Sequence, residues 1–271
     1  MQVFGHRGAC GYLPENTMES FELAFELGSD AIEFDVVLTK DGHPVILHDD
    51  DLTKTTNVLD TDLPRFVQEV SLSELSSLRV NERYPGRTQS AQHSGKFRIP
   101  TLQEVLENPV FGGRHLIIEV KYGKKFAELG LDIVAATAGA IEASGWQQRG
   151  MQLTIECFEF GVLRDLKRAI HGPEFVFLSA PDTLPEGRES LADDLLAEIA
   201  SEFDGVSVAI EMLIQDDLVS RAKALGLKVF AYTARVETAQ GEVDQWFRKL
   251  IDTGVDGLFA DQPDRLKALV R

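Results

Sequence analysis

Cysteine, basic residues and long apolar runs are all scarce in this sequence. Its 271 residues include only two cysteines, Cys10 and Cys157, which are too few for a disulfide framework and which we expect to be free, buried thiols. No apolar run approaches the roughly 18 residues that a membrane-spanning helix needs. The first residues carry neither the basic nor the apolar segment of a secretory signal. We therefore expect a cytoplasmic protein without stable membrane association.

The charge balance is strongly acidic. Lysine and arginine number 27 against 44 aspartate and glutamate residues, which gives a formal net charge of −17. This charge opposes broad contact with nucleic acid, and we expect no such partner. It remains compatible with a small anionic substrate, because a metal ion or a few local cations can override the overall field. No linker or repeat divides the chain, so we expect a single domain over residues 1–271.

Short β-like runs alternate with helical segments along the whole chain. The helical segments carry one apolar face, as Leu129, Ile133, Ala136 and Ala140 do. Such alternation predicts an α/β fold with a parallel sheet covered by helices. The β-like runs are 3–6, 31–37, 44–48, 115–120, 153–158, 175–178, 205–208, 229–232 and 257–260.

Nine runs are one more than an eight-stranded (β/α)8 barrel holds, and a hairpin explains the surplus. Only six residues separate Val37 from Pro44, whereas a helical crossover needs a dozen or more. Asp41-Gly42 suits a two-residue type I′ turn. Residues 44–48 then form a short antiparallel arm after the second strand, and eight parallel strands remain for the barrel.

The same turn predicts a register for the arm. Lys40 pairs with His43, and counting back two residues at a time brings Asp35 opposite His48. A carboxylate and an imidazole would then meet at the C-terminal end of the barrel, where active sites of this architecture lie.

The sequence also predicts three helix starts and one irregular segment. Capping-box spacing occurs at Asn16…Glu19, Ser71…Glu74 and Thr101…Glu104. Residues 81–95 are polar and have no period, so we expect a mobile loop there that could cover the site.

Acidic residues on predicted strands are the first candidates for chemistry. Glu33 and Asp35 alternate on one strand and so point the same way, and Glu119 lies on another. Buried acids are costly unless something compensates their charge. A hard divalent cation with oxygen ligands would do so, and so would an ion-pair network in which Lys121 neutralises one acid. Spacing alone leaves both explanations open.

The second candidate group is basic. His6 ends the first predicted strand and is followed by Arg7, whose guanidinium can make two parallel hydrogen bonds to a phosphate. A histidine at a strand end is usually structural. His6 is nevertheless a candidate catalytic residue, because His48, Glu33 and Asp35 are expected at the same end of the barrel.

The N-terminal part of the sequence carries five short motifs, His6-Arg7-Gly8, Pro14-Glu15-Asn16-Thr17, Glu33-Phe34-Asp35-Val36, Thr39-Lys40-Asp41-Gly42 and His48-Asp49. Further motifs follow in Ile99-Pro100-Thr101-Leu102, in Glu119-Val120-Lys121 and in Gly254-Val255-Asp256-Gly257 with Asp261 and Pro263. The order of these motifs resembles that of the glycerophosphodiester phosphodiesterase family. The resemblance is densest over residues 1–57.

The resemblance implies a TIM barrel that hydrolyses a glycerophosphodiester to an alcohol and sn-glycerol 3-phosphate. It implies one divalent cation, Mg²⁺ or Ca²⁺, with Mn²⁺ as a further option. The implied metal ligands are Glu33, Asp35 and Glu119. The implied acid–base pair is His6 and His48. The implied substrate contacts are Arg7, Lys121, Glu15 and Asn16, although Asn16 also fits a helix N-cap.

Two later motifs depart from the family pattern. Cys157-Phe158 stands where the family often has Ser-Phe, and the segment 232–235 reads Tyr-Thr-Ala-Arg where the family often has Trp-Thr-x-Asn. We expect Phe158 and Tyr232 to line the alcohol side of the substrate site, because both follow late strands. Tyrosine keeps an aromatic wall with a polar tip, whereas Arg235 adds a charge, so the alcohol preference stays open.

Other functions fit less well. Cleavage of a lipid phosphodiester, as by a lysophospholipase D or a phospholipase C, would require an apolar rim or a basic surface, and the net charge argues against it. A non-catalytic phosphodiester-binding barrel would lack a metal ligand or a histidine, and none is missing. The nucleophile can be water or the substrate's glycerol 2-hydroxyl. The sequence gives no indication of the oligomeric state.

Overall fold

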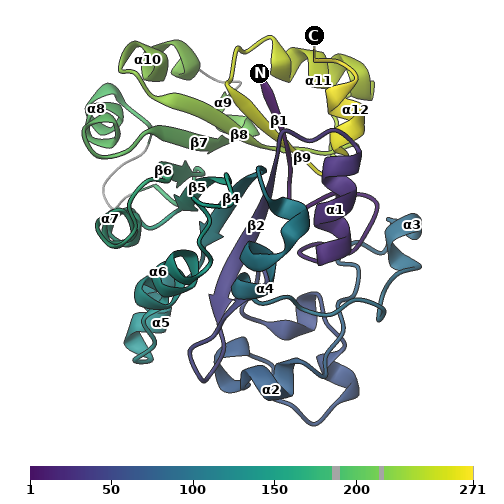
Figure 1. The fold of residues 1–271 in the computed structure, drawn as a ribbon. Helices are drawn as coiled ribbons and strands as arrows, with labels where there is room; N and C mark the ends of the chain where they lie inside the picture. Colours follow the sequence, from purple (N-terminus) through teal and green to yellow (C-terminus); the bar gives the residue numbers. More distant parts are fainter. Residues whose placement is uncertain (185–189, 214–216, 271) are drawn as a thin grey trace.

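The sheet closes into an eight-stranded parallel barrel surrounded by helices (Figure 1). The computed structural model describes residues 1–184, 190–213 and 217–270. Each parallel strand is bonded to the next around the ring, and pairing of β1 with both β2 and β9 closes it. The predicted TIM barrel is thus confirmed. The parallel strands are β1 (Gln2–Gly5), β2 (Ala31–Leu38), β4 (His115–Val120), β5 (Gln152–Cys157), β6 (Glu174–Ser179), β7 (Gly205–Ala209), β8 (Lys228–Ala234) and β9 (Gly257–Ala260).

The remaining strand, β3 (Pro44–Ile46), forms the antiparallel arm on β2, as predicted. The predicted register is wrong by one residue. Val36 pairs with Ile46, and the Leu47 amide donates to the carbonyl of Asp35 at 3.1 Å, so Leu47 and not His48 lies opposite Asp35.

The slip has its cause in the turn. A type I′ turn needs two central residues with positive φ, but of the two predicted ones only Gly42 has it, at 78°. The Gly42 amide instead donates to the Thr39 carbonyl at 3.0 Å, and the Thr39 amide donates to the His43 carbonyl at 3.1 Å. The loop therefore has three residues and ends in a left-handed glycine, the next most common hairpin geometry.

Most of the helices pack outside the barrel and bury an apolar face against it (Figure 1). Capping boxes open α2 and α4 as predicted. The first helix differs, because Thr17, and not Asn16, is the N-cap and accepts from the Ser20 amide. The helices are α1 (Met18–Glu26), α2 (Leu72–Leu75), α3 (Thr88–Ala91), α4 (Leu102–Glu107), α5 (Gly123–Glu128), α6 (Ile133–Ala143), α7 (Phe160–Ala169), α8 (Asp193–Glu202), α9 (Ile210–Leu213), α10 (Leu218–Ala224), α11 (Val243–Ile251) and α12 (Pro263–Lys267).

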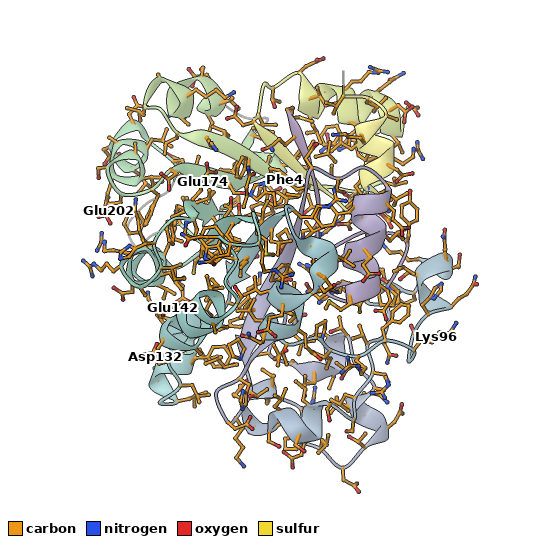
Figure 2. All side chains as sticks on the ribbon, viewed as in Figure 1. Phe4, Lys96, Asp132, Glu142, Glu174 and Glu202 are labelled. Carbon is orange, nitrogen blue, oxygen red and sulfur yellow. The ribbon has the colours of Figure 1, made fainter. Side chains whose placement is uncertain are left out.

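Two apolar cores hold the barrel. The larger lies between strands and helices, and the smaller fills the floor of the barrel around Phe4, which Figure 2 labels. Phe4 packs edge-on against Phe230 and Phe259, with ring centroids 5.0 Å apart in both pairs. A Cβ at position 257 would lie 2.2 Å from Phe4, so glycine is required there. Above this apolar floor the inward-facing positions become polar.

A long excursion separates β3 from β4 and forms a lobe beside the barrel, in blue at the bottom of Figure 1. It contains the short 3-10 helices Leu52–Lys54, Val58–Asp60 and Val67–Glu69. Its polar segment 81–95, predicted as a mobile loop, contains α3 and places Arg87 in a buried position. Among the described residues, no helix has both the length and the apolar character needed to cross a membrane.

Candidate active site

A cavity of about 470 Å³ opens at the C-terminal ends of the barrel strands. His6 follows β1, Glu33 lies on β2 and Glu119 on β4. Phe158, which follows β5, and Tyr232, on β8, also line the cavity. The cavity therefore lies where the loops of a (β/α)8 barrel build active sites. Eight predicted site residues line it: His6, Arg7, Glu33, His48, Glu119, Lys121, Phe158 and Tyr232.

Three carboxylates converge beneath the cavity. Glu33, Asp35 and Glu119 each offer an oxygen, and these oxygens lie within 4.8 Å of one another. All three side chains are buried, and among the described residues Oε1 of Glu33 has no hydrogen-bond partner. Inward-pointing oxygens at this spacing are what a hard divalent cation requires.

The alternative explanation, an ion-pair network around Lys121, accounts for only part of the acidic charge. Lys121 Nζ lies 3.1 Å from Asp35 Oδ1 and 2.5 Å from Glu119 Oε1. Burial would raise the pKa of Asp35, but Lys121 and Arg7 hold it well below its usual value. Burial raises the pKa of Glu119 to about 7, despite Lys121.

Glu33 is compensated least. Burial, followed by repulsion from Asp35 and Glu119, raises its pKa well above the usual range. Its Oε2 accepts from the Arg7 amide at 2.9 Å, while Oε1 has no hydrogen-bond partner in the part of the chain that the structure describes. Lys121 and Arg7 both lie against Asp35 and leave Glu33 with its pKa raised, so the three acids still fit a divalent cation.

The loops that deliver these groups use unusual backbone conformations. Arg7 and Asn16 are left-handed, with φ of 52° and 58°. Such conformations cost energy in residues other than glycine and tend to persist at functional sites. Here Arg7 Nε lies 3.3 Å from Asp35 Oδ2, and Asn16 Nδ2 donates to the same oxygen at 2.8 Å. Asn16 thus supports Asp35 from behind the cavity.

His6 is oriented by a carboxylate from the far end of the chain. Its Nδ1 lies 2.7 Å from Asp261 Oδ1 in a buried hydrogen bond, which leaves Nε2 for the cavity. Burial and the charge of Arg7 lower the pKa of His6 to about 4, although Asp261 acts in the opposite direction. His6 is therefore neutral near pH 7 and able to accept a proton.

His48 has a similar arrangement. Its Nδ1 lies 3.3 Å from Asp49 Oδ1, without good hydrogen-bond geometry. Burial, together with Arg7 and Lys121, lowers its pKa. Each histidine thus has an aspartate near Nδ1, and both are neutral before a substrate anion arrives.

Sequence reasoning missed the arginines of segment 81–95. Arg83 donates to both oxygens of Glu15 at 2.8 Å and contacts Asp49 at 2.5 Å. Arg87 pairs with Asp261 and donates to the carbonyl of Cys10 at 2.9 Å. These contacts join the loop to the supports of both histidines. No periodicity marks two arginines in an irregular segment, so only the tertiary structure locates them.

Asp261 is a buried centre of charge, and we expect Asp261→Asn to lower the unfolding free energy by about 3 kcal/mol. The carboxylate is fully buried among His6, Arg87 and Arg235, whose Nε lies 2.9 Å away. Removing one partner of a buried ion pair leaves the others uncompensated, which costs about 3–5 kcal/mol. Urea unfolding at pH 7 measures the loss.

The exposed Asp252→Asn is the matched control, expected to change stability by less than about 0.5 kcal/mol. An equal change in both variants would contradict the structural role of Asp261.

Glu15 makes the stability of the fold depend on pH. It lies behind the cavity between Arg7, at 2.9 Å, and Arg83. Burial would raise its pKa, but these two arginines lower it from 4.5 to about 2. The carboxylate therefore stabilises the fold fully above pH 4.5, and this contribution disappears as the pH falls towards 2.

The free energy of unfolding of the wild type should fall as the pH is lowered from 5 to 2. In Glu15→Gln we expect this fall to be smaller by about 3 kcal/mol. Urea unfolding across that range is the measurement. Parallel pH profiles of the two proteins would show that Glu15 does not hold the depressed pKa.

The sequence analysis also missed the buried acid Glu156, although the sequence carried a signal for it. Glu156 on β5 is paired in register with Glu119 on β4 and lines the cavity. The alternation that selected Glu33 and Asp35 also places Glu156 on the inner face of its strand. Burial and Glu119 raise its pKa well above the usual value.

Comparisons with known proteins agree on one family. The model of the glycerophosphoryl diester phosphodiesterase family matches residues 6–265. The glycerophosphodiester phosphodiesterase of Caldanaerobacter subterraneus subsp. tengcongensis is 29% identical over 99% of this chain and 97% of its own length. That of Bacillus subtilis is 29% identical over 96% of this chain and 83% of its own.

A solved structure gives the same result. The phosphodiesterase of Oleispira antarctica, solved in complex with the product sn-glycerol-3-phosphate, is 27% identical, with a TM-score of 0.79 over 99% of this chain and 96% of its own.

Proposed function

The chain belongs to the glycerophosphoryl diester phosphodiesterase family, and on that premise we propose that it hydrolyses glycerophosphodiesters to an alcohol and sn-glycerol 3-phosphate in a metal-dependent reaction. One observation carries the proposal: two neutral histidines and three convergent carboxylates share a cavity with Arg7 and Lys121. Phosphodiester cleavage requires this combination of proton transfer and charge neutralisation.

The proposed acid–base pair is His6 and His48. Each has Nδ1 beside an aspartate, at 2.7 Å and 3.3 Å, so each presents Nε2 for proton transfer. One imidazole takes the proton of the nucleophile, and the other protonates the departing alkoxide. The substrate's phosphate anion favours the imidazolium that donates, because an opposite charge nearby raises a histidine pKa.

The proposed metal ligands are Glu33, Asp35 and Glu119, holding one Mg²⁺ or Ca²⁺ ion, with Mn²⁺ as a third option. When bound, the ion would neutralise phosphate charge and polarise the phosphoryl group. Arg7 and Lys121 bind phosphate oxygens from the same wall. Phe158 and Tyr232 line the alcohol side.

Glu15 and Asn16 act through their neighbours. Glu15 holds Arg7, and Asn16 holds Asp35. We further propose that residues 1–271 act as one catalytic domain in the cytoplasm on a small-molecule substrate, without a nucleic-acid partner. The net charge of −17 and the two buried, free cysteines support this setting.

The test is release of sn-glycerol 3-phosphate from glycerophosphocholine and glycerophosphoethanolamine. The protein is treated with EDTA and then given Mg²⁺, Ca²⁺ or Mn²⁺. Restored release names the ion and supports the proposal, whereas no release with any ion rejects it. Lysophosphatidylcholine serves as the control for the lipid-cleaving alternative, and preferential cleavage of that lipid would favour the alternative. Phosphorus NMR during turnover distinguishes attack by water from attack by the 2-hydroxyl, which forms a cyclic phosphate first.

A further inference from the structure

Arg87 joins three loops at the seam where β1 and β9 close the barrel. Its Nε donates to Glu237 Oε1 at 2.6 Å, and one terminal nitrogen donates to the Cys10 carbonyl at 2.9 Å. The other terminal nitrogen donates to Asp261 Oδ2. These partners follow β8, β1 and β9, whereas Arg87 belongs to the lobe and directly precedes α3, at the right of Figure 1. One side chain of the lobe therefore ties together the C-terminal ends of the first and last strands.

Arg87 is shielded from the substrate cavity. Only 4% of its side chain is exposed, and each of its three guanidinium nitrogens donates to an acceptor behind the cavity. His6 is among the described residues that line the cavity, whereas Arg87 is not. Arg87 can therefore affect a reaction in the cavity only through the residues that it holds.

The residue that links Arg87 to His6 is Asp261. Its Oδ1 lies 2.7 Å from His6 Nδ1, while its Oδ2 accepts from Arg87. Hydrogen bonds between a guanidinium and a carboxylate are strong and directional. Because the two oxygens of a carboxylate move together, a bond that fixes Oδ2 also fixes the direction of Oδ1, and with it the plane of the imidazole.

Arg235 does not duplicate this role. Its Nε lies 2.9 Å from the same Oδ2, but without the geometry of a hydrogen bond. Its side chain is 25% exposed and lines the cavity. Arg235 thus contributes charge beside Asp261, whereas Arg87 contributes direction.

Cys10 shows what Asp261 prevents. The Cys10 thiol sulfur lies 3.9 Å from His6 Nδ1 and 3.6 Å from an Arg87 terminal nitrogen. If Asp261 turned away, the imidazole would meet this thiol, which is only a weak acceptor. The ring could then adopt the other neutral tautomer, in which Nε2 carries the proton and cannot act as a base.

We propose that Arg87 is a positioning residue for the reaction: by bridging Asp261 to Cys10 and Glu237, it holds His6 with the proton on Nδ1 and with Nε2 free to accept one. This inference rests on the proposed acid–base role of His6. It adds a residue that touches no substrate, and it makes the lobe beside the barrel necessary for turnover.

The first experiment observes His6 directly in the metal-free protein. Selective ¹⁵N labelling of histidine reports the tautomer of each ring by NMR, and His6→Ala assigns the His6 signals. In the wild type at pH 7 we expect a neutral ring with a slowly exchanging proton on Nδ1. Arg87→Met should give a mixture of tautomers and lose that proton signal through exchange. A wild-type His6 spectrum in a folded Arg87→Met protein would overturn the inference.

Kinetics then test whether this orientation matters. In Arg87→Met we expect kcat to fall about 30-fold at unchanged KM, because a misplaced catalytic group costs up to about 10²-fold. In the His6→Ala background the same substitution should cost less than about twofold, because its target is absent. Equal losses in both backgrounds would overturn the inference. If the wild type releases no sn-glycerol 3-phosphate, the proposed function fails, and the tautomer alone decides whether Arg87 orients His6.

Two further variants separate positioning from folding. Arg98→Met is the matched control, because Arg98 belongs to the same lobe, is 63% exposed and forms only a surface pair with Glu104 at 3.4 Å. It should keep the wild-type kcat and His6 tautomer. Arg87→Lys keeps a charge beside Asp261 and should fold, but an ammonium cannot bridge three loops, so kcat should fall about tenfold with mixed tautomers. A wild-type kcat and tautomer in Arg87→Lys would also overturn the inference.

Discussion

Replacing His48 with alanine is expected to lower kcat about 10³-fold or more, and replacing His6 is expected to do the same. General acid–base catalysis by a positioned side chain contributes roughly 10²–10⁴-fold. His6 is buried and His48 is half-buried, and both line the cavity above the carboxylates. The measurement is steady-state release of sn-glycerol 3-phosphate at saturating metal.

The losses in kcat caused by the two single substitutions should not add in the double mutant. If His6 and His48 act in one concerted proton relay, removing either already loses most of the benefit of both. His43→Ala is the matched control, because His43 lies in the exposed hairpin with 55% of its side chain accessible. Circular dichroism and urea unfolding establish that each variant folds. Residual activity within tenfold of wild type in a folded His48→Ala protein would remove His48 from the mechanism.

Glu33→Gln is expected to lower kcat/KM about 10³-fold and to abolish metal-dependent stabilisation. Loss of a metal that neutralises transition-state charge costs several kcal/mol, or about three orders of magnitude in rate. Glu33 is the informative position, because its Oε1 has no hydrogen-bond partner among the residues that the structure describes, so we expect metal binding to be its main role.

Thermal unfolding gives a readout apart from activity. At metal concentrations about 100-fold above Kd, binding stabilises the wild type by about 2.7 kcal/mol, which corresponds to a rise in Tm of roughly 5–10 °C for a chain of this size. Glu33→Gln should show no rise, whereas the exposed control Glu142→Gln should behave as wild type. Below about pH 7 the rise should shrink, because the proton on Glu119 competes with the metal. A full rise in Tm for Glu33→Gln would place the ion elsewhere.

Strand positions were the most predictable feature, because each strand is a short apolar run between clear helical periods. All nine runs proved to be strands, and the run 115–120 has the predicted bounds. The predicted register of the hairpin was wrong by one residue. The turn type depends on whether Asp41 adopts positive φ, and the Asp-Gly dipeptide alone does not decide that. A one-residue slip is enough to change which residues face each other.

The site residues were likewise predictable on strands and not predictable in loops. Residues on strands, such as Glu33 and Glu119, could be placed from alternation. Asn16 could not, because its left-handed backbone and its bond to Asp35 compete with the helix-capping role that its sequence position favours. Arg83 and Arg87 act across gaps of 68 and 174 residues, to Glu15 and Asp261, and local sequence carries no trace of such contacts.

The closure of the barrel by β1 and β9 also sets when the protein can begin to work. His6 and Asp261 are 255 positions apart in the chain, and β1 obtains one of its two neighbours only when residues 257–260 have been made. At about 5–20 residues per second, a ribosome needs on the order of 10–50 s to reach that point. Until then the first strand has an unpaired edge and His6 has no aspartate to orient it. A nascent chain that stops short of these residues therefore carries nearly all the candidate site residues but not the assembled site.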